Sequence, residues 1–343
     1  MVVLGCTKSK KGKILEYDYG IKIDSLLKTN ETRYFNGVIL ITQNGQTKYS
    51  TTVGYSDFEN KTPISLNDNF RIQSNSKQIT AVLIMKQVEQ GKIDLQKAIK
   101  SYLPEMQQTW ADSVTVHQLL NMSSGVIRLD RPLLFTPGSS YQYSNAAYGL
   151  LGKILEKVTG KPYVGLANTL FAELSMTKTY CFEYGGQSDH LINGYIKTAE
   201  GYQPDDFYAR GITPEGWPDF IPAGGIVSNA YDLLTWDTKL HQGELLKPES
   251  YQKMINYHIK GAHAAFGPEP IGYGYGLRID KTRSLKVIGH AGKGIGFTNL
   301  KFYVPEKDLH VIMLENVYDN DPKIVYHFEK TLLDLVMNSS LVD

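Results

Sequence analysis

Apolar residues recur every three or four positions in several segments of the chain, which is the spacing of amphipathic helices. This pattern predicts helices over residues 19–28, 76–90, 116–122, 146–158, 163–174 and 323–336. Gly91 and Gly160 follow two of these segments, and glycine commonly ends a helix. The middle of the chain is therefore predicted to be mainly helical.

Short apolar runs bounded by turn residues predict strands near both ends of the chain. Two of them flank Asn44-Gly45, a dipeptide typical of a β-hairpin. The predicted strands cover residues 35–42, 48–53, 273–279, 285–288, 298–304 and 309–314, with a turn at 305–308. Short turns between successive strands favour an antiparallel sheet.

Strands at both ends and helices between them indicate a domain that is discontinuous in sequence. We expect an α/β (α+β) sheet domain of residues 19–75 and 222–343, flanked by the N- and C-terminal helices. A mainly helical domain of residues 76–221 would interrupt it. Within this insertion, residues 185–220 lose regular periodicity and carry six aromatic residues: Tyr195, Tyr202, Phe207, Tyr208, Trp217 and Phe220. Such a segment is typical of a lid or pocket wall, and a packed irregular loop explains it equally well.

Length and composition exclude several classes of protein. A length of 343 residues corresponds to about two domains at roughly 150 residues each. Hydrophobic residues make up 42% of the chain, which is enough for a core and excludes wholesale disorder. The net charge is +1 with no basic stripe, so nucleic acid is not an expected partner. No apolar run approaches the roughly 18 residues that a membrane span requires.

The two cysteines, Cys6 and Cys181, are too few for a disulfide framework or a four-cysteine zinc site. Val3-Leu4-Gly5-Cys6 is similar to the end of a bacterial lipoprotein signal, although the basic and most of the apolar part are missing. We therefore expect residues 1–18 to be a flexible tail with a lipobox remnant. A lipid on Cys6 would be the only membrane contact, in a periplasmic or other extracytoplasmic location. An accidental match would leave a cytoplasmic location open.

The sharpest local feature is Ser74-Asn75-Ser76-Lys77 at the start of a predicted helix. Residues three apart on a helix share a face, so the Lys77 amine can lie beside the Ser74 hydroxyl. A serine needs a base to become nucleophilic, and lysine is a base only when its pKa is lowered by burial or a neighbouring cation. The alternative is a serine that caps the helix, followed by a solvated lysine.

Two further clusters carry candidate chemistry. Tyr143 and Asn145 precede a helix, where a phenol can relay a proton and an amide can hold a lysine or a carbonyl group. Gly289-His290-Ala291-Gly292 follows a predicted strand, and its small residues would let a substrate backbone lie along the strand edge. A core aromatic before a helix cap, and a strand-ending turn with a surface histidine, are the alternatives.

In this order, the three clusters resemble the S-x-x-K, Y-x-N and H-x-G motifs of the serine hydrolases related to class C β-lactamases. That superfamily includes penicillin-binding carboxypeptidases, D-amino-acid peptidases and esterases. The resemblance extends from about Phe35 to Leu314 and includes the segments 70–77, 119–125, 135–138 and 223–228. It implies a β-lactamase/transpeptidase-like fold, an antiparallel sheet with an all-helical insertion, and no metal or organic cofactor.

The resemblance also implies roles for single residues. Ser74 would be the acylated nucleophile, and Lys77 would take or shuttle its proton. Tyr143 would be the general base or acid, and Asn145 would orient Lys77 and the substrate amide.

The third motif would bind the substrate. His290 would lie beside Tyr143, and Ala291 and Gly292 would line the substrate path. The backbone N–H groups of Ser74 and Lys293 would form the oxyanion hole.

The sequence departs from the family pattern in three places. Ala291 lacks the hydroxyl that helps relatives hold a substrate carboxylate. Either Lys293 compensates or the substrate lacks that carboxylate, so efficient β-lactamase activity is not expected. Only nine residues separate Gly125 from Phe135, which implies a more open site. Asn121-Met122 replaces the usual His-Thr, with an expected effect on local packing only.

The resemblance as a whole implies a serine acyl hydrolase. Its substrate would be an amide or ester of a small molecule or short peptide, such as a D-amino-acid peptide, a cell-wall fragment, a β-lactam or a small ester. The alternative is a non-catalytic or slow-turnover protein that binds penicillin or peptidoglycan on the same fold.

Overall fold

In the computed structural model, the described residues are 18–29, 32–184, 190–205 and 213–343. Their main feature is an eight-stranded antiparallel sheet in the order β10-β11-β12-β13-β14-β15-β1-β2. In that order the strands are Lys260–His263, Gly267–Tyr273, Arg278–Asp280, Val287–Gly294, Phe297–Val304, Leu309–Glu315, Gly37–Gln43 and Gln46–Val53. The N- and C-terminal parts of the chain therefore share one sheet, since β1 pairs with both β2 and β15. Cys6 and residues 1–17 of the predicted tail lie outside the described residues, and the last residue of that prediction, Asp18, begins a helix.

The central strands of the sheet are buried on both faces because their residues alternate between two cores, whereas the edge strand β2 is partly exposed. In β1, Val38 and Leu40 join the core on the side of the internal helices. Ile39 and Ile41 point the other way and join the core formed with the terminal helices. This sorting follows from the two-residue period of a strand, and it explains why β1 is an unbroken apolar run.

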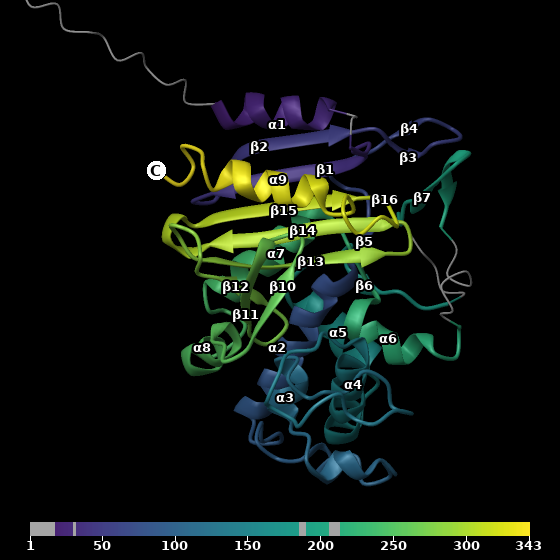
Figure 1. The fold of residues 1–343 in the computed structure, drawn as a ribbon, viewed down its shortest axis with the longest axis vertical. Coiled ribbons are helices and arrows are strands. Elements are labelled where there is room, and N and C mark those ends of the chain that lie inside the picture. Colours follow the sequence, from purple (N-terminus) through teal and green to yellow (C-terminus); the bar gives the residue numbers. More distant parts are fainter. Residues whose placement is uncertain (1–17, 30–31, 185–189, 206–212) are drawn as a thin grey trace, which may run out of the picture.

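The two terminal helices, α1 (Asp18–Lys28) and α9 (His327–Val336), contact each other and cover the same face of the sheet. In Figure 1 they lie together on the side of the sheet away from helices α2 to α5. The sequence predicted α1 closely, but α9 begins at His327 rather than at residue 323. The preceding residues form a turn in which the N–H groups of Ile324 and Val325 both donate to the Asp321 carbonyl group.

The helices between the strands include all four that the sequence predicted there. These are α2 (Ser76–Glu89), α3 (Val116–Leu120), α4 (Asn145–Thr159) and α5 (Tyr163–Glu173). Three further helices were not predicted: α6 (Trp217–Gly224), α7 (Ala230–His241) and α8 (Pro248–Ile255). No helix among the described residues is both long and apolar enough to cross a bilayer.

Short elements complete the described part of the chain. The short strands are β3 (Tyr55–Asp57), β4 (Thr62–Pro63), β5 (Phe70–Arg71), β6 (Tyr180–Cys181), β7 (Tyr195–Thr198), β8 (Gly201–Pro204), β9 (Ile226–Ser228) and β16 (Val317–Tyr318). The segment 185–220 is therefore not irregular throughout, because β7 and β8 form a hairpin beside β16. Residues 185–189 and 206–212 of that segment lie outside the described part.

The single strand predicted over residues 273–279 is wrong, because a turn separates β11 from β12. The Gly274 N–H donates to the Leu277 carbonyl group, and Gly276 has a φ of +68°. Glycine adopts that conformation without the cost that a Cβ atom would bring. The chain therefore reverses within what the apolar pattern presents as one continuous strand.

The strand predicted to end at residue 288 is too short, because β13 continues to Gly294. Its residue-by-residue pairing with β14 includes His290 with Lys301 and Gly294 with Phe297. The His-Ala-Gly motif therefore lies inside a strand and not in a strand-ending turn. Pairing with β12 reaches only to Gly289, so the motif follows the point where that pairing stops.

Candidate active site

Ser74 lies in a tight turn that connects a short strand to α2. β5 pairs with β9, and the chain then forms the 3₁₀ turn Gln73–Asn75, in which Gln73 has a φ of +49°. Asn75 and not Ser74 is the residue that precedes α2, so the interpretation of Ser74 as the helix cap is wrong. Ser74 remains partly exposed, whereas Gln73 and Asn75 are buried.

Lys77 is fully buried, and its amine contacts three groups. The Nζ atom lies 2.8 Å from Asn145 Oδ1, 2.7 Å from the Ala223 carbonyl oxygen and 3.1 Å from Ser74 Oγ. The first two are acceptors only, so they take both hydrogens of a neutral amine. The lone pair then faces the Ser74 hydroxyl. The alternative of a solvated lysine is therefore wrong.

The surroundings of Lys77 favour this neutral form. Burial lowers the pKa of the Lys77 amine well below its usual value, and the positive charge of Arg278 lowers it further. Both effects disfavour the ammonium form, which would lose water and face a like charge. The amine also lies 4.7 Å from the centre of the Tyr143 ring.

Tyr143 and Asn145 reach the cleft from the beginning of α4. Ser144 caps this helix, because its side chain accepts from the Ala147 N–H at 3.0 Å. The Tyr143 hydroxyl oxygen is buried and forms no hydrogen bond of ordinary geometry to the described residues. Burial raises the pKa of this phenol, and the Ser74 hydroxyl is the largest influence that lowers it. A neutral phenol therefore lies next to Ser74.

β13 lies against the Ser74 turn at backbone contact distance. A Cβ atom on Gly292 would lie 2.9 Å from the Ile72 carbonyl oxygen and 2.7 Å from Gln73 Cβ, so only glycine fits without a shift. The Gln73 side chain donates to the Gly294 carbonyl group at 2.5 Å. Lys293 is exposed between these two glycines.

His290 is completely buried and is held as a neutral imidazole. Burial lowers its pKa well below the usual value, and Arg278 and Lys77 add to this effect. Its Nδ1 lies 2.6 Å from the Ala291 carbonyl oxygen, which is an acceptor only, so Nδ1 carries the hydrogen. Nε2 then accepts from the Tyr273 hydroxyl at 3.1 Å. The ring centre lies 6.1 Å from that of Tyr143, as the expected position beside Tyr143 requires.

Arg278 is the main residue of the cleft that the sequence motifs did not include. Its side chain is buried on β12 and donates to the Tyr141 hydroxyl at 3.1 Å. Its Nε and Nη1 atoms are buried without a hydrogen-bond partner among the described residues. The only feature of the sequence that pointed to Arg278 was its position between two apolar residues, Leu277 and Ile279. That position indicates a buried strand residue only when the turn at Gly276 is known.

A cavity of about 470 Å³ opens beside Ser74. Its walls are formed by Ser74, Tyr141, Tyr143, Asn145, Ala262, His263, Ala264, Arg278, Ala291, Lys293, Pro322, Val325 and Tyr326. This set of described residues contains two cations and no carboxylate. No group of three or more His, Cys, Asp or Glu side chains in the described part of the chain is arranged to hold a metal ion.

Comparison with known proteins places the whole sheet and both sides of the cleft within one family. The family model described as Beta-lactamase matches residues 23–333. Protein flp of Staphylococcus aureus is 24% identical over 328 residues, which cover 86% of this chain and 62% of that protein. Penicillin-binding protein 4* of Bacillus subtilis is 25% identical over 83% of this chain and 69% of its own length. The chain thus spans somewhat less than two thirds of the first of these relatives.

Solved structures share the fold. A penicillin-binding protein homologue from Pyrococcus abyssi, described as octameric, has a TM-score of 0.76 and 27% identity over 94% of this chain and 77% of its own. A D-amino acid amidase from Ochrobactrum anthropi, in complex with L-phenylalanine amide, has a TM-score of 0.79 and 24% identity over 94% of this chain and 99% of its own.

Proposed function

Because the chain belongs to the Beta-lactamase family, we propose that it is a serine acyl hydrolase that forms a covalent acyl-enzyme on Ser74. The observation that carries the proposal is the contact between the Ser74 hydroxyl and the buried Lys77 amine at 3.1 Å. A lowered pKa favours the neutral amine, which can take the proton of the serine hydroxyl, and an activated serine requires such a base.

Acylation uses the two groups that adjoin Ser74. The Ser74 oxygen forms a bond to the carbonyl carbon while Lys77 takes its proton. The tetrahedral intermediate then expels the leaving amine or alcohol, which receives a proton from the Tyr143 hydroxyl. Lys77 returns its proton to Tyr143, so the net transfer is from serine to leaving group. Water then attacks the acyl-enzyme by the reverse proton path and releases the acid.

Developing negative charge on the carbonyl oxygen requires donors fixed in advance. We assign these to the backbone N–H groups of Ser74 and Lys293, because Gly292 lets β13 approach the Ser74 turn at backbone distance. Asn145 holds Lys77 through its oxygen, which leaves its amide hydrogens for a substrate carbonyl group. His290 is a neutral ring that accepts a hydrogen bond from Tyr273 and donates one to the Ala291 carbonyl group. Because both ring nitrogens are occupied in this way, we assign it no proton transfer.

The cleft favours a substrate that carries a carboxylate. Two N–H groups of Arg278 are buried without a partner among the described residues, and an unpaired buried charge is costly. A carboxylate would satisfy them with charge-assisted hydrogen bonds. Arg278, with Lys293 nearby in the same cavity, would then replace the hydroxyl that Ala291 lacks. A short D-peptide or related cell-wall fragment with a free carboxylate fits this description.

Covalent labelling tests the proposal. A fluorescent phosphonate should label the wild-type protein, and Ser74→Ala should abolish the labelling while the circular dichroism spectrum stays unchanged. Ser76→Ala, two residues away, is the matched control and should label normally. Undiminished labelling of Ser74→Ala would refute the mechanism. A third outcome is a wild type that labels normally and yet keeps a substrate acyl group attached for hours. That result would favour the alternative of a slow-turnover protein that binds penicillin or peptidoglycan.

We also propose an extracytoplasmic location with a lipid on Cys6, which rests on the Val3-Leu4-Gly5-Cys6 sequence. Expression in a bacterial host with a complete upstream signal should give a membrane-associated, lipid-labelled protein. Cys6→Ala should remove both properties. Lipid labelling that persists in Cys6→Ala would contradict this proposal.

A further inference from the structure

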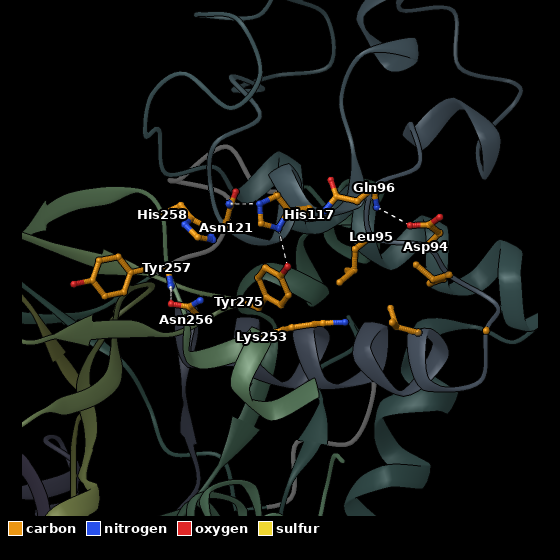
Figure 2. A pocket seen from close by; sticks show the side chains of 13 residues that line it. Asp94, Leu95, Gln96, His117, Asn121, Lys253, Asn256, Tyr257, His258 and Tyr275 are labelled. Carbon is orange, nitrogen blue, oxygen red and sulfur yellow. Dashed lines mark hydrogen bonds between the residues drawn. The ribbon is translucent and has the colours of Figure 1, made fainter. Parts of the chain in front are cut away.

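A second cavity of about 510 Å³ lies between the end of α2, the helices α3 and α8, and the turn after β11. None of its lining residues lines the Ser74 cleft. Figure 2 shows Tyr275 at its centre, with its hydroxyl directed at His117 and with Lys253 below its ring. Leu95 contributes an apolar wall. The cavity thus combines apolar surface with a small number of polar groups, as small-molecule sites do.

A chain of hydrogen bonds fixes which atoms of Asn121, His117 and Tyr275 donate in this cavity. Asn121 Oδ1 accepts from the Ser123 N–H at 3.2 Å, so the amide nitrogen is the atom that faces His117 Nε2 at 3.1 Å. That nitrogen donates, so Nε2 accepts and Nδ1 of the neutral ring carries the hydrogen. Nδ1 then donates to the Tyr275 hydroxyl at 2.7 Å. Burial, with a contribution from His258, lowers the pKa of His117 and favours this neutral ring.

This order leaves the Tyr275 hydroxyl with a hydrogen of its own to donate. Lys253 offers an ammonium group that forms no ion pair within the described part of the chain. The amide nitrogen of Asn256 is a third donor, because the Asn256 oxygen accepts from the next backbone N–H at 2.9 Å. The one carboxylate of the cavity, Asp94, accepts from the backbone N–H two residues later at 2.9 Å. The free polar groups around Tyr275 therefore suit a ligand that accepts hydrogen bonds and carries negative charge.

Both polar walls of the cavity adjoin the Ser74 cleft. Gly276, next to Tyr275, packs so closely on α2 that a Cβ atom would lie 2.7 Å from the Lys77 carbonyl oxygen. On the opposite wall, Met122 follows α3, and its sulfur accepts from the Ser144 N–H at 3.2 Å. A change in the position of either wall would therefore be felt by Lys77 or by the turn that carries Tyr143.

We propose that this cavity is a regulatory site for a small carboxylate with an apolar body. The carboxylate accepts from Tyr275 and pairs with Lys253, and the apolar body lies on Leu95 and the Tyr275 ring. Binding of the ligand does not depend on the reaction proposed for Ser74. The regulatory effect rests on that proposed function, because it is read from the reactivity of Ser74.

The binding experiment uses phenylacetate as the probe in isothermal titration calorimetry. Tyr275→Phe should weaken binding by about tenfold, since it removes a hydrogen bond to a charged group. Lys253→Gln should weaken it by about threefold, as expected for an exposed ion pair. Lys97→Gln, an exposed lysine that does not line the cavity, is the control and should bind as the wild type does.

Arg278→Gln decides which cavity the probe occupies. Binding that survives Arg278→Gln and is weakened by Tyr275→Phe supports the proposal. Binding that is lost in Arg278→Gln and unaffected by Tyr275→Phe would place the probe in the Ser74 cleft and overturn the proposal. No detectable heat at millimolar phenylacetate would overturn it as well.

The regulatory part is tested by the rate of phosphonate labelling at Ser74. Saturating phenylacetate should change this rate by about fivefold or more in the wild type, which is the lower range of allosteric coupling. The rate in Tyr275→Phe should respond only at about tenfold higher concentration. A constant rate in the wild type, with binding confirmed, would overturn the regulatory role. An absence of labelling at any concentration would count against the function proposed for Ser74 and not against binding.

Discussion

Basic side chains are buried in two settings among the described residues. In one setting they have a carboxylate partner and stabilise the fold, and in the other they have none and are available for catalysis and binding. Under α7, Lys301 forms an ion pair with Asp237, which also accepts from His310 at 2.7 Å. In the cleft, Lys77 and Arg278 are equally buried and have no carboxylate partner among the described residues. Within the described residues, the chain thus pairs a buried cation in one place, and in the other it leaves the Arg278 cation without a carboxylate beside a lysine amine that is held neutral.

The paired setting has carboxylate partners for its buried basic side chains, which the described part of the cleft lacks. Burial alone would raise the pKa of Asp237, but Lys301 and His241 hold it well below its usual range. Arg33 is paired in the same way, with Glu315 at 2.7 Å and Glu329 at 3.0 Å. In the cleft, burial and the positive charge of Arg278 lower the pKa of Lys77. Without a carboxylate partner in the described part of the chain, Lys77 is available as a neutral base and Arg278 as a cation for an anionic ligand.

The comparison is tested most strongly by Lys77→Met. We expect labelling and kcat/KM to fall by about 10³-fold or more, because the variant has no base beside Ser74. Stopped-flow labelling with a phosphonate measures the effect, and Lys86→Met on the same helix is the control. A variant that still labels within about tenfold of the wild-type rate would show that Lys77 is not the base.

Replacement of each buried lysine by methionine should change the free energy of unfolding by different amounts in the two settings. Lys301→Met leaves Asp237 buried without its cation and should lower the free energy of unfolding by about 3–5 kcal/mol. Lys77→Met removes a neutral amine and should lower it by about 1 kcal/mol. Urea denaturation at neutral pH measures both. Equal losses for the two variants would contradict the distinction.

Arg278→Gln tests whether the unpaired guanidinium binds the substrate. For an acyl-dipeptide with a free carboxylate, kcat/KM should fall by about 10–100-fold, the value of a hydrogen bond between charged groups. For the same compound with an amidated end, kcat/KM should fall much less in Arg278→Gln, because that compound lacks the charge that Arg278 would bind. If both compounds lose activity equally, Arg278 does not recognise the carboxylate.

The smallest expected effect is a displacement of the pH profile. Lys77 is active as the neutral amine, so kcat/KM should rise with pH through the lowered pKa of Lys77. Arg278→Gln removes the neighbouring positive charge that contributes to the lowering, so the acid limb should move to higher pH. Measurement with the amidated substrate avoids the binding effect. An acid limb that moves to lower pH in Arg278→Gln would contradict the proposed influence.

Local periodicity was sufficient for the helices that carry Lys77 and Asn145. The apolar spacing over residues 76–90 corresponds to α2, and that over residues 146–158 corresponds to α4, because each helix has enough turns for its period to show. The family resemblance then supplied the residues that meet at Lys77. The geometry brings Ser74, Lys77 and Asn145 into hydrogen-bond contact, although their catalytic roles remain proposals.

Features that depend on contacts between distant positions could not be predicted. The turn between β11 and β12 depends on Gly276 fitting against the Lys77 backbone, 199 positions earlier in the numbering. The length of β13 depends on pairing with β14, which overrides the weak strand preference of His-Ala-Gly. Arg278 became visible as a cleft residue only after both were known.

The close fit at Gly292 separates the geometry of the reaction centre from the shape of the cavity wall. Its hydrogen in place of a side chain lets two stretches of backbone come into contact, and the Gln73 side chain joins them through its bond to the Gly294 carbonyl group. The spacing between Ser74 and β13 is therefore set by residues that do not line the cavity. Residues such as Tyr141 and Tyr326 can then be exchanged to admit different acyl groups while that spacing stays constant. Descendants of this sequence could therefore acquire new substrates through single wall substitutions without rebuilding the reaction centre.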